Sequence, residues 1–291
     1  MNRLLAAATA TLLELPVIAQ APAVSFSADL TPQVRFDGEG KTRFRLYDDT
    51  GELSRVRMNL TFDNGLQIRY FQKLARIDHD TDDSGTEEFY LEDPNRWSIG
   101  KRYVPFGSNR MLREPAIGAS AKVFLPIADF PLQIAAFDNG PREQRGVAGR
   151  IGENPAVSFF VGEHFGIAST SLTQIRFPEE APGEGRGYRR AFGADHTLGA
   201  GGWQAVLEYV ALRQPHRAGD SQLDVASLLI TYQFPYGPLV LMDVAVASAE
   251  PRTSIRWSAQ IPVEKNLFLV PSMRLTSADG WRAALSMRIR L

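Results

Sequence analysis

The sequence predicts an all-β chain that closes into an antiparallel transmembrane β-barrel of about 16 strands, within a range of about 12 to 18. Apolar and polar side chains alternate with period two from about residue 41 onward. Many candidate strands have about the 9 to 11 residues that a tilted membrane strand needs. The N-terminus has the form of a secretory signal. A secreted β-sandwich or solenoid would show the same alternation and is the alternative fold.

The first 23 residues predict a signal peptide. Arg3 supplies the positive charge, residues 4–19 are the apolar stretch, and residues 21–23 have the small-x-small form of a cleavage site. Glu14 and Pro16 interrupt the apolar stretch, so an amphipathic or buried N-terminal helix is the alternative. We expect residues 24–40 to be a periplasmic segment or a first strand, and residues 41–291 to form the barrel.

Composition excludes several functional classes. The formal net charge is -1, which gives no basic excess for nucleic acid. The chain has no Cys, so disulfides, thiolate metal sites and cysteine nucleophiles are excluded. No cofactor is expected. Arg makes up 27 of the 32 basic residues, and the positions of these arginines carry the functional argument.

Two segments show the strand pattern most clearly. In residues 281–291, Trp, Ala, Leu, Met and Ile fall on one face, and three Arg and two small residues fall on the other. In residues 53–70, two alternating runs flank Asp63-Asn64-Gly65, whose residues favour the positive φ angles of a tight hairpin.

The strand number follows from parity. The candidates from residue 41 onward number about seventeen, whereas a bacterial barrel with both termini on the periplasmic side needs an even number. Short turns and long connections alternate regularly in both halves, which assigns long connections such as 104–116 and 176–186 to the extracellular side. The counts from the two ends differ by one, so one strand between about residues 117 and 175 is either split or missed. Residues 166–175 are among the candidate strands in this region. Sixteen strands are expected, or eighteen if residues 26–36 pair.

Arginines on the polar face of these strands are expected to line the lumen, because the lipid face tolerates Arg poorly. They are Arg43, Arg45, Arg55, Arg57, Arg69, Arg252, Arg256, Arg282, Arg288 and Arg290. The last strand pairs with the first, so these residues should form one wall. Glu208, Asp224 and Asp243 are expected on an opposing wall of mixed or acidic character. Such a lumen would favour small anions such as phosphate or chloride. The alternative is that the arginines pair with carboxylates and only stiffen the wall.

Residues 86–113 resemble the phosphate-selective porin O and P family. The resemblance rests on a hairpin followed by Gly100, Pro105, Phe106 and Gly107 in a Gly-x-x-x-x-Pro-Phe-Gly element. It implies a sixteen-stranded, arginine-lined barrel of the outer membrane, a loop after this element that folds toward the pore, and a homotrimer.

Other motifs carry less weight. The acidic run at residues 78–85 lacks the Gly and Glu positions of a calcium loop. Asp195-His196 is the one hint of a catalytic pair. The sequence therefore predicts a non-enzymatic porin in the lipid of the bacterial outer membrane. The alternatives are a barrel hydrolase using His196 or His164, and a non-conducting barrel plugged by residues 24–40 or 104–116.

Overall fold

The computed structural model describes residues 22–45, 55–73, 86–109, 111, 115–125, 130–138, 145–165, 187–215, 222–248, 252–277 and 280–291. In these residues, 18 strands form one antiparallel sheet. They are β1 (Ala23–Leu30), β2 (Gln33–Asp37), β3 (Thr42–Arg45), β4 (Arg55–Thr61), β5 (Gln67–Lys73), β6 (Thr86–Asp93), β7 (Trp97–Tyr103), β8 (Pro115–Leu125), β9 (Phe130–Asp138), β10 (Arg145–Ile151), β11 (Ala156–Phe165), β12 (Tyr188–Ala200), β13 (Trp203–Pro215), β14 (Leu223–Gln233), β15 (Leu239–Ala247), β16 (Arg252–Glu264), β17 (Leu267–Thr276) and β18 (Gly280–Arg290). Within the same residues, no helix is long and apolar enough to cross a membrane.

β1 and β2 make a single pass across the wall. Asp29 lies opposite Arg290 on β18, and Asp37 lies opposite Arg282 in the same unbroken register. The ladder is interrupted at Pro32, which has no N–H to donate, although its carbonyl still accepts from Met287 N at 2.9 Å. β3 pairs with β2 and β4 pairs with β1, so these two strands share the next pass.

The 18 strands therefore make a closed barrel of 16 passes. The prediction of sixteen strands is confirmed, but the strand assignment behind it was partly wrong. Residues 26–36 do pair without raising the total to eighteen, because β3 and β4 share one pass. The predicted strand 166–175 lies outside the described residues, and β11 pairs directly with β12.

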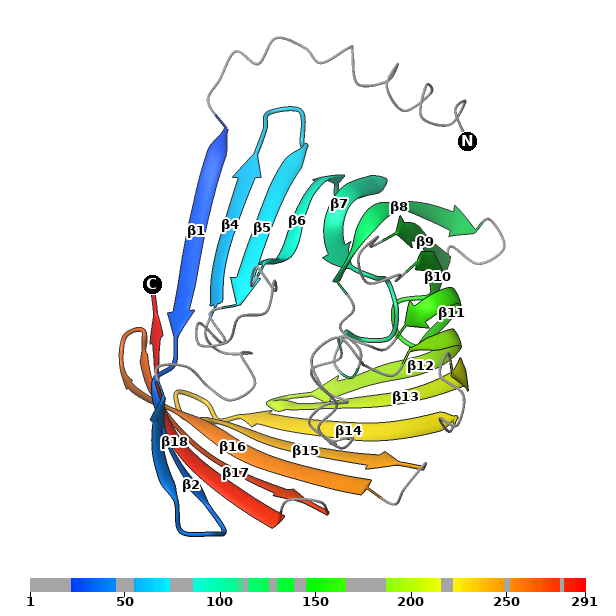
Figure 1. The fold of residues 1–291 in the computed structure, drawn as a ribbon. Helices are drawn as coiled ribbons and strands as arrows, with labels where there is room; N and C mark the ends of the chain where they lie inside the picture. The colour runs from blue at the N-terminus through cyan, green and yellow to red at the C-terminus, as the bar shows by residue number, and fades with distance from the viewer. Residues whose placement is uncertain are drawn as a thin grey trace.

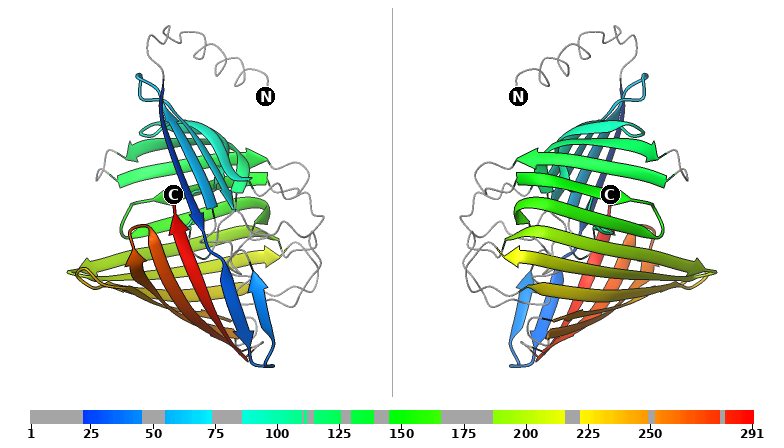
Figure 2. Two further views of the ribbon diagram at one scale, coloured as in Figure 1. Left: turned by 90° about the vertical axis from the view of Figure 1, so that its left-hand side faces the viewer. Right: turned by 90° about the vertical axis from the view of Figure 1, so that its right-hand side faces the viewer.

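β4 to β18 pair in sequence order around the ring, and β1 closes it (Figure 1). The C-terminus lies beside β1, where Ala28 and Leu291 exchange backbone hydrogen bonds of 3.1 and 2.8 Å. The side views of the same ring show the strands strongly tilted (Figure 2). Tilt of this kind is required to close a sheet into a barrel.

Short turns gather at one end of the barrel. They join β4 to β5, β6 to β7, β10 to β11, β12 to β13, β14 to β15 and β16 to β17. The longest connections, between β5 and β6 and between β11 and β12, belong to the opposite end. In outer-membrane barrels the short turns are periplasmic, so the long connections are extracellular, as predicted. The hairpin at residues 62–66 is confirmed, although only Gly65 of its turn has a positive φ, of 85°.

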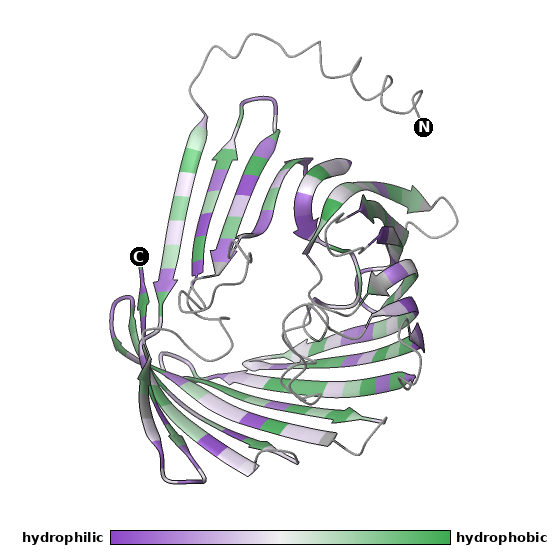
Figure 3. Cartoon of the chain, viewed as in Figure 1, coloured by the Kyte–Doolittle hydropathy of each residue, from purple (hydrophilic) through white to green (hydrophobic). Residues whose placement is uncertain are grey.

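Hydrophobic and hydrophilic residues alternate along many of the strands (Figure 3). The hydrophobic residues point to the outer face of the barrel. Large hydrophobic side chains on alternate strand positions are exposed there, among them Ile99, Val157, Phe192, Met273 and Leu285. Their polar neighbours in sequence point to the lumen. This arrangement suits a strand barrel surrounded by lipid. Tyr90 lies on a lumen-facing position and is buried inside the barrel at 6% exposure.

The hydrophobic core lies inside the barrel. Side chains of β9 to β14 that point inward, including Phe160, Leu212 and Val225, pack with residues of the segment that follows β7. This part of the lumen wall is therefore not polar, because a segment of the chain covers it.

Candidate functional site

The segment after β7, residues 104–109 and 111, lies inside the ring of strands; we call it the inner loop. Gly107 N donates to Ser158 Oγ of β11 at 2.9 Å. Gly107 O accepts from Arg150 of β10, whose guanidinium also forms a forked ion pair with Asp195 of β12. The loop that the resemblance implied does fold into the lumen, and it is fixed to the wall at this point.

Glu208 of β13 anchors the next residues of the inner loop. Its carboxylate accepts from Ser108 N at 3.0 Å, Ser108 Oγ at 2.7 Å and Met111 N at 3.3 Å. Glu208 is only 3% exposed, so these donors replace the water that a buried carboxylate loses. Gly107 has a φ of +59°, and an added Cβ would lie 2.2 Å from Glu208 Oε1. Only glycine fits this position of the Pro-Phe-Gly element.

Phe106 fixes the inner loop on its apolar side. Its ring meets Phe165 at a centroid distance of 5.1 Å, and Phe165 stacks on Phe160 at 4.2 Å. Gly193 leaves room for it, since an added Cβ would lie 3.1 Å from the ring. The inner loop therefore occupies the side of the lumen along β9 to β14. The contacts described above do not reach the opposite wall.

Arginines line that opposite wall. Seven of the predicted residues have described side chains and lie on lumen-facing strand positions: Arg55, Arg57, Arg69, Arg256, Arg282, Arg288 and Arg290. The side chains of Arg43, Arg45 and Arg252 lie outside what the structure describes. The structure adds Arg35 of β2, Arg102 of β7 and Arg274 of β17. We call the ten described arginines the arginine wall.

Part of the arginine wall is a row across neighbouring strands. Its members are direct cross-strand partners in the order Asp243, Arg256, Arg274, Arg282 and Asp37. Arg256 Nη2 lies 3.5 Å from Asp243 Oδ2. Like charges directly opposite each other repel, so three adjacent arginines flanked by two aspartates leave a positive centre to the row.

A second group surrounds Asp29 at the junction of β1, β4 and β18. Arg55 Nε lies 3.0 Å from Asp29 Oδ2, Arg288 Nη2 lies 3.0 Å from Oδ1, and Arg290 Nε lies 3.6 Å from Oδ1. Arg288 is nearly buried and also donates to Gln260 Oε1 at 3.2 Å. Three guanidinium groups share one carboxylate, which leaves positive charge in excess.

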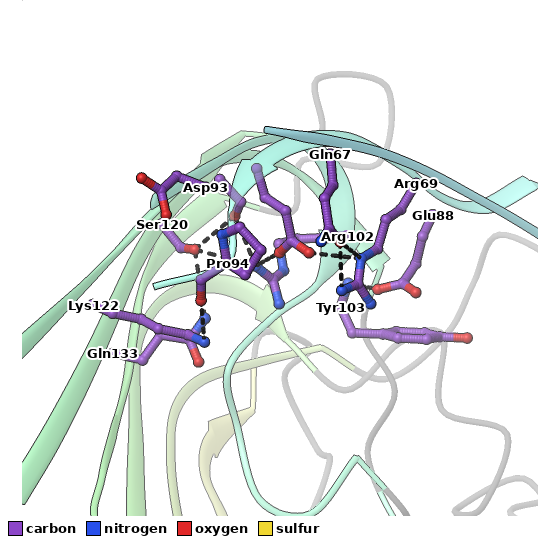
Figure 4. A network of polar contacts seen from close by, with 12 residues as sticks. Gln67, Arg69, Glu88, Asp93, Pro94, Arg102, Tyr103, Ser120, Lys122 and Gln133 are labelled. Atoms are coloured by element: carbon purple, nitrogen blue, oxygen red, sulfur yellow. Dashed lines mark hydrogen bonds and ion pairs between the residues drawn. The ribbon is translucent and has the colours of Figure 1, made fainter. Parts of the chain in front are cut away.

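A third group lies on β5 to β8 (Figure 4). Arg69 Nε lies 2.6 Å from Glu92 Oε1, and Arg102 Nη1 lies 3.9 Å from the other oxygen of Glu92. Arg102 also donates to Ser98 Oγ at 2.8 Å and covers the Tyr90 ring, 4.8 Å from its centroid. These contacts hold the guanidinium groups in fixed positions around one carboxylate.

Arg57 is the most open member of the arginine wall on β4. Its guanidinium lies 4.9 Å from the ring centroid of Phe71, and the residue is exposed to the lumen. Among the described residues, no carboxylate lies within ion-pair distance of it. Arg57 is therefore available to a solute.

The predicted opposing acidic wall is wrong in two of its three residues. Asp243 belongs to the arginine wall, through Arg256. Asp224 of β14 points outward, where it binds Arg213 and the Tyr209 hydroxyl, because its neighbour Leu223 takes the buried inward position. Glu208 does face the lumen, but the backbone of the inner loop covers it.

Asp195 and His196 do not form the catalytic pair that the sequence suggests. Successive strand residues point to opposite faces, so Asp195 points inward to Arg150 while His196 contacts Asn154 Oδ1 at 2.8 Å at the periplasmic turn. Among the described residues, no cluster of His, Asp or Glu could hold a metal ion. The acidic run at 78–85 and the side chain of His164 lie outside the described residues.

Comparison with known proteins supports the fold. No family model matches the chain, and no curated protein matches its sequence. Among solved structures, the outer membrane channel DcaP of Acinetobacter baumannii matches with a TM-score of 0.60 at 10% identity, over 93% of this chain and 98% of that one. The anion-selective porin from Comamonas acidovorans matches with a TM-score of 0.59 at 12% identity, over 92% and 99%. A loop-deletion mutant of OmpT, an outer membrane protein of Vibrio cholerae, matches with a TM-score of 0.58 at 11% identity, over 94% and 100%.

These neighbours share a porin-like barrel with this chain. The identities are too low to carry more than the fold, and the phosphate-selective O and P family is not established by them.

Proposed function

We propose that the protein is an outer-membrane porin that passes small solutes by diffusion and prefers anions. The observation that carries the proposal is the arginine wall. In the described residues, the carboxylates on lumen-facing positions beside its ten arginines are Asp29, Asp37, Glu88, Glu92 and Asp243, and Glu87 lies at the bulge of β6. The arginines therefore outnumber the carboxylates. Fixed positive charge in a narrow aqueous lumen attracts anions, and guanidinium groups bind oxyanions by forked hydrogen bonds.

The inner loop supports the proposal by restricting the path. It occupies the lumen beside β9 to β14, so a solute that passes must move along the opposite side, where the arginines lie. The similar structures of an outer membrane channel and of an anion-selective porin are consistent with this proposal. No catalytic step is part of it.

Conductance in planar bilayers tests the proposal. We expect discrete channels whose conductance falls more when chloride is replaced by a bulky anion than when potassium is replaced by a bulky cation. Well-folded protein that forms no channels would refute the porin function, and a stronger dependence on the cation would refute the anion preference.

We further propose a homotrimer. One similar structure is the trimer form of OmpT of Vibrio cholerae. Native mass spectrometry of the detergent-extracted protein should give three times the mass of one chain, and a monomer under gentle extraction would contradict the assembly.

A further inference from the structure

Two arginines lie side by side on the outer face of the barrel, near its extracellular end. Arg190 and Arg213 are direct cross-strand partners near the extracellular ends of β12 and β13. Their position on the outer face follows from strand alternation, because Val161 lies opposite Arg190 and is 56% exposed, and Leu212 beside Arg213 is fully buried. A charged pair facing lipid is unusual and calls for a compensating partner.

The neighbouring strands hold Arg213 in place. Its guanidinium binds Asp224, and Nη1 donates to Leu212 O at 3.1 Å and to Leu223 O at 3.2 Å. Tyr209 donates its hydroxyl to the same carboxylate. Asp224 therefore neutralises Arg213 and leaves the second guanidinium of the pair uncompensated.

Arg190 is that second guanidinium. It is exposed and, among the described residues, makes no ion pair. Like charges directly opposite in a sheet destabilise the pair, with Cβ atoms about 4.5 to 5.5 Å apart. An anion between the two side chains would remove this repulsion.

The surroundings indicate which anion can reach the pair. Toward the middle of the barrel, the outer face of the same strands carries Phe192 at 53% exposure and Leu207 at 44%. These side chains meet acyl chains, so the arginines beyond them lie at the level of the outer-leaflet headgroups. A further ion pair, Arg145 with Glu163 at 2.8 Å, lies on the outer face of β10 and β11 near the same end.

We propose that Arg190 and Arg213 bind a phosphate group of an outer-leaflet lipid headgroup. Arg190 offers an open guanidinium fork, and Arg213 offers the N–H donors that it does not give to Asp224 or to the two backbone carbonyls. Both side chains can therefore donate to one phosphate, and Arg is well suited to such contacts. The apolar face below them receives the acyl chains of the same lipid. This site lies on the opposite surface of the wall from the lumen and does not depend on the proposed porin function.

Binding of a phosphorylated lipid tests the proposal. The refolded full-length protein in detergent is titrated with fluorescent lipid A carrying both phosphates, and with its dephosphorylated form. We expect the phosphorylated form to bind more tightly, and Arg190→Gln to weaken that binding roughly tenfold, the loss of one charge-assisted contact. The matched control is Arg96→Gln, which removes an exposed arginine from the periplasmic turn between β6 and β7.

Each outcome decides the proposal. Equal binding of the two lipids, or equal binding by Arg190→Gln and Arg96→Gln, would overturn it. Complete displacement by millimolar inorganic phosphate would assign the site to free phosphate and overturn the lipid assignment. Arg190→Gln removes no hydrogen bond or ion pair among the described residues, so its native folding, checked by heat-modifiable gel migration, keeps the comparison valid.

Discussion

The anchor formed by Glu208 predicts how firmly the inner loop is held. In Glu208→Ala, Ser108 N, Ser108 Oγ and Met111 N lose their acceptor. A hydrogen bond to a charged group contributes about 1.5 to 3 kcal/mol, and bonds to one carboxylate are not additive. We take about 3 kcal/mol for the group, which weakens the docking of the inner loop roughly a hundredfold.

Hydrogen exchange measured by mass spectrometry tests this value. The amides of Ser108 and Met111 should exchange roughly a hundredfold faster in Glu208→Ala. Glu208→Gln should lie between the variant and the wild type, because the amide oxygen retains one acceptor. Single-channel current should become larger or noisier in Glu208→Ala as the loop leaves the wall.

The control for this prediction is Asp243→Asn, which changes a lumen carboxylate on the arginine wall. It should leave exchange in the inner loop unchanged. Unaltered exchange at Ser108 and Met111 in Glu208→Ala would refute the idea that this carboxylate holds the loop.

Four further predictions follow from the same geometry. Gly107→Ala should cost about 1 to 3 kcal/mol of loop docking, from its positive φ and the contact with Glu208, and should speed exchange of the loop amides. Arg288→Gln should lower the free energy of unfolding in urea by about 2 to 3 kcal/mol, less than the loss of every partner of a buried carboxylate, because Arg55 and Arg290 remain beside Asp29. An unchanged urea midpoint would contradict the role of this group at the barrel junction. Anion preference should weaken as KCl rises from about 0.1 to 1 M, since the screening length falls from about 10 to 3 Å. The chain has no Cys, so Ser272→Cys in the lumen should react faster with an anionic than a cationic thiosulfonate, whereas the control Met273→Cys faces lipid and should react with neither.

Strand alternation carried much of the fold prediction. In β18, Leu285 and Met287 face outward while Ser286 and Arg288 are buried on the lumen side, as the period-two pattern indicated. The pattern is predictive because each side chain of a membrane strand faces either lipid or the lumen, and a charged side chain is much more stable in the lumen.

Residues 23–37 were harder to place. Their first half pairs with β4 and their second half with β18, and Pro32 breaks the pattern between them. This strand pairing brings Asp29 beside three arginines. A single Asp in a short segment gives no indication in the sequence of those three partners. The same holds for Arg150 and Asp195, which are 45 residues apart in sequence.

The inner wall beside the inner loop also departed from the simple pattern. Leu212 and Val225 face the lumen and yet are fully buried, because the inner loop covers them. A pattern that assigns apolar residues to lipid cannot anticipate an apolar lumen face. The Pro105-Phe106-Gly107 element was the one sequence signal that pointed to it.

The zero-current potential of the refolded protein under a KCl gradient tests the central claim most directly. The account predicts a potential of the sign set by chloride, reduced in Arg57→Gln and unchanged in Arg190→Gln, which removes the same charge from the outer face of the barrel. A potential set by potassium, or an equal effect of the two substitutions, would contradict the claim that the arginine wall selects anions.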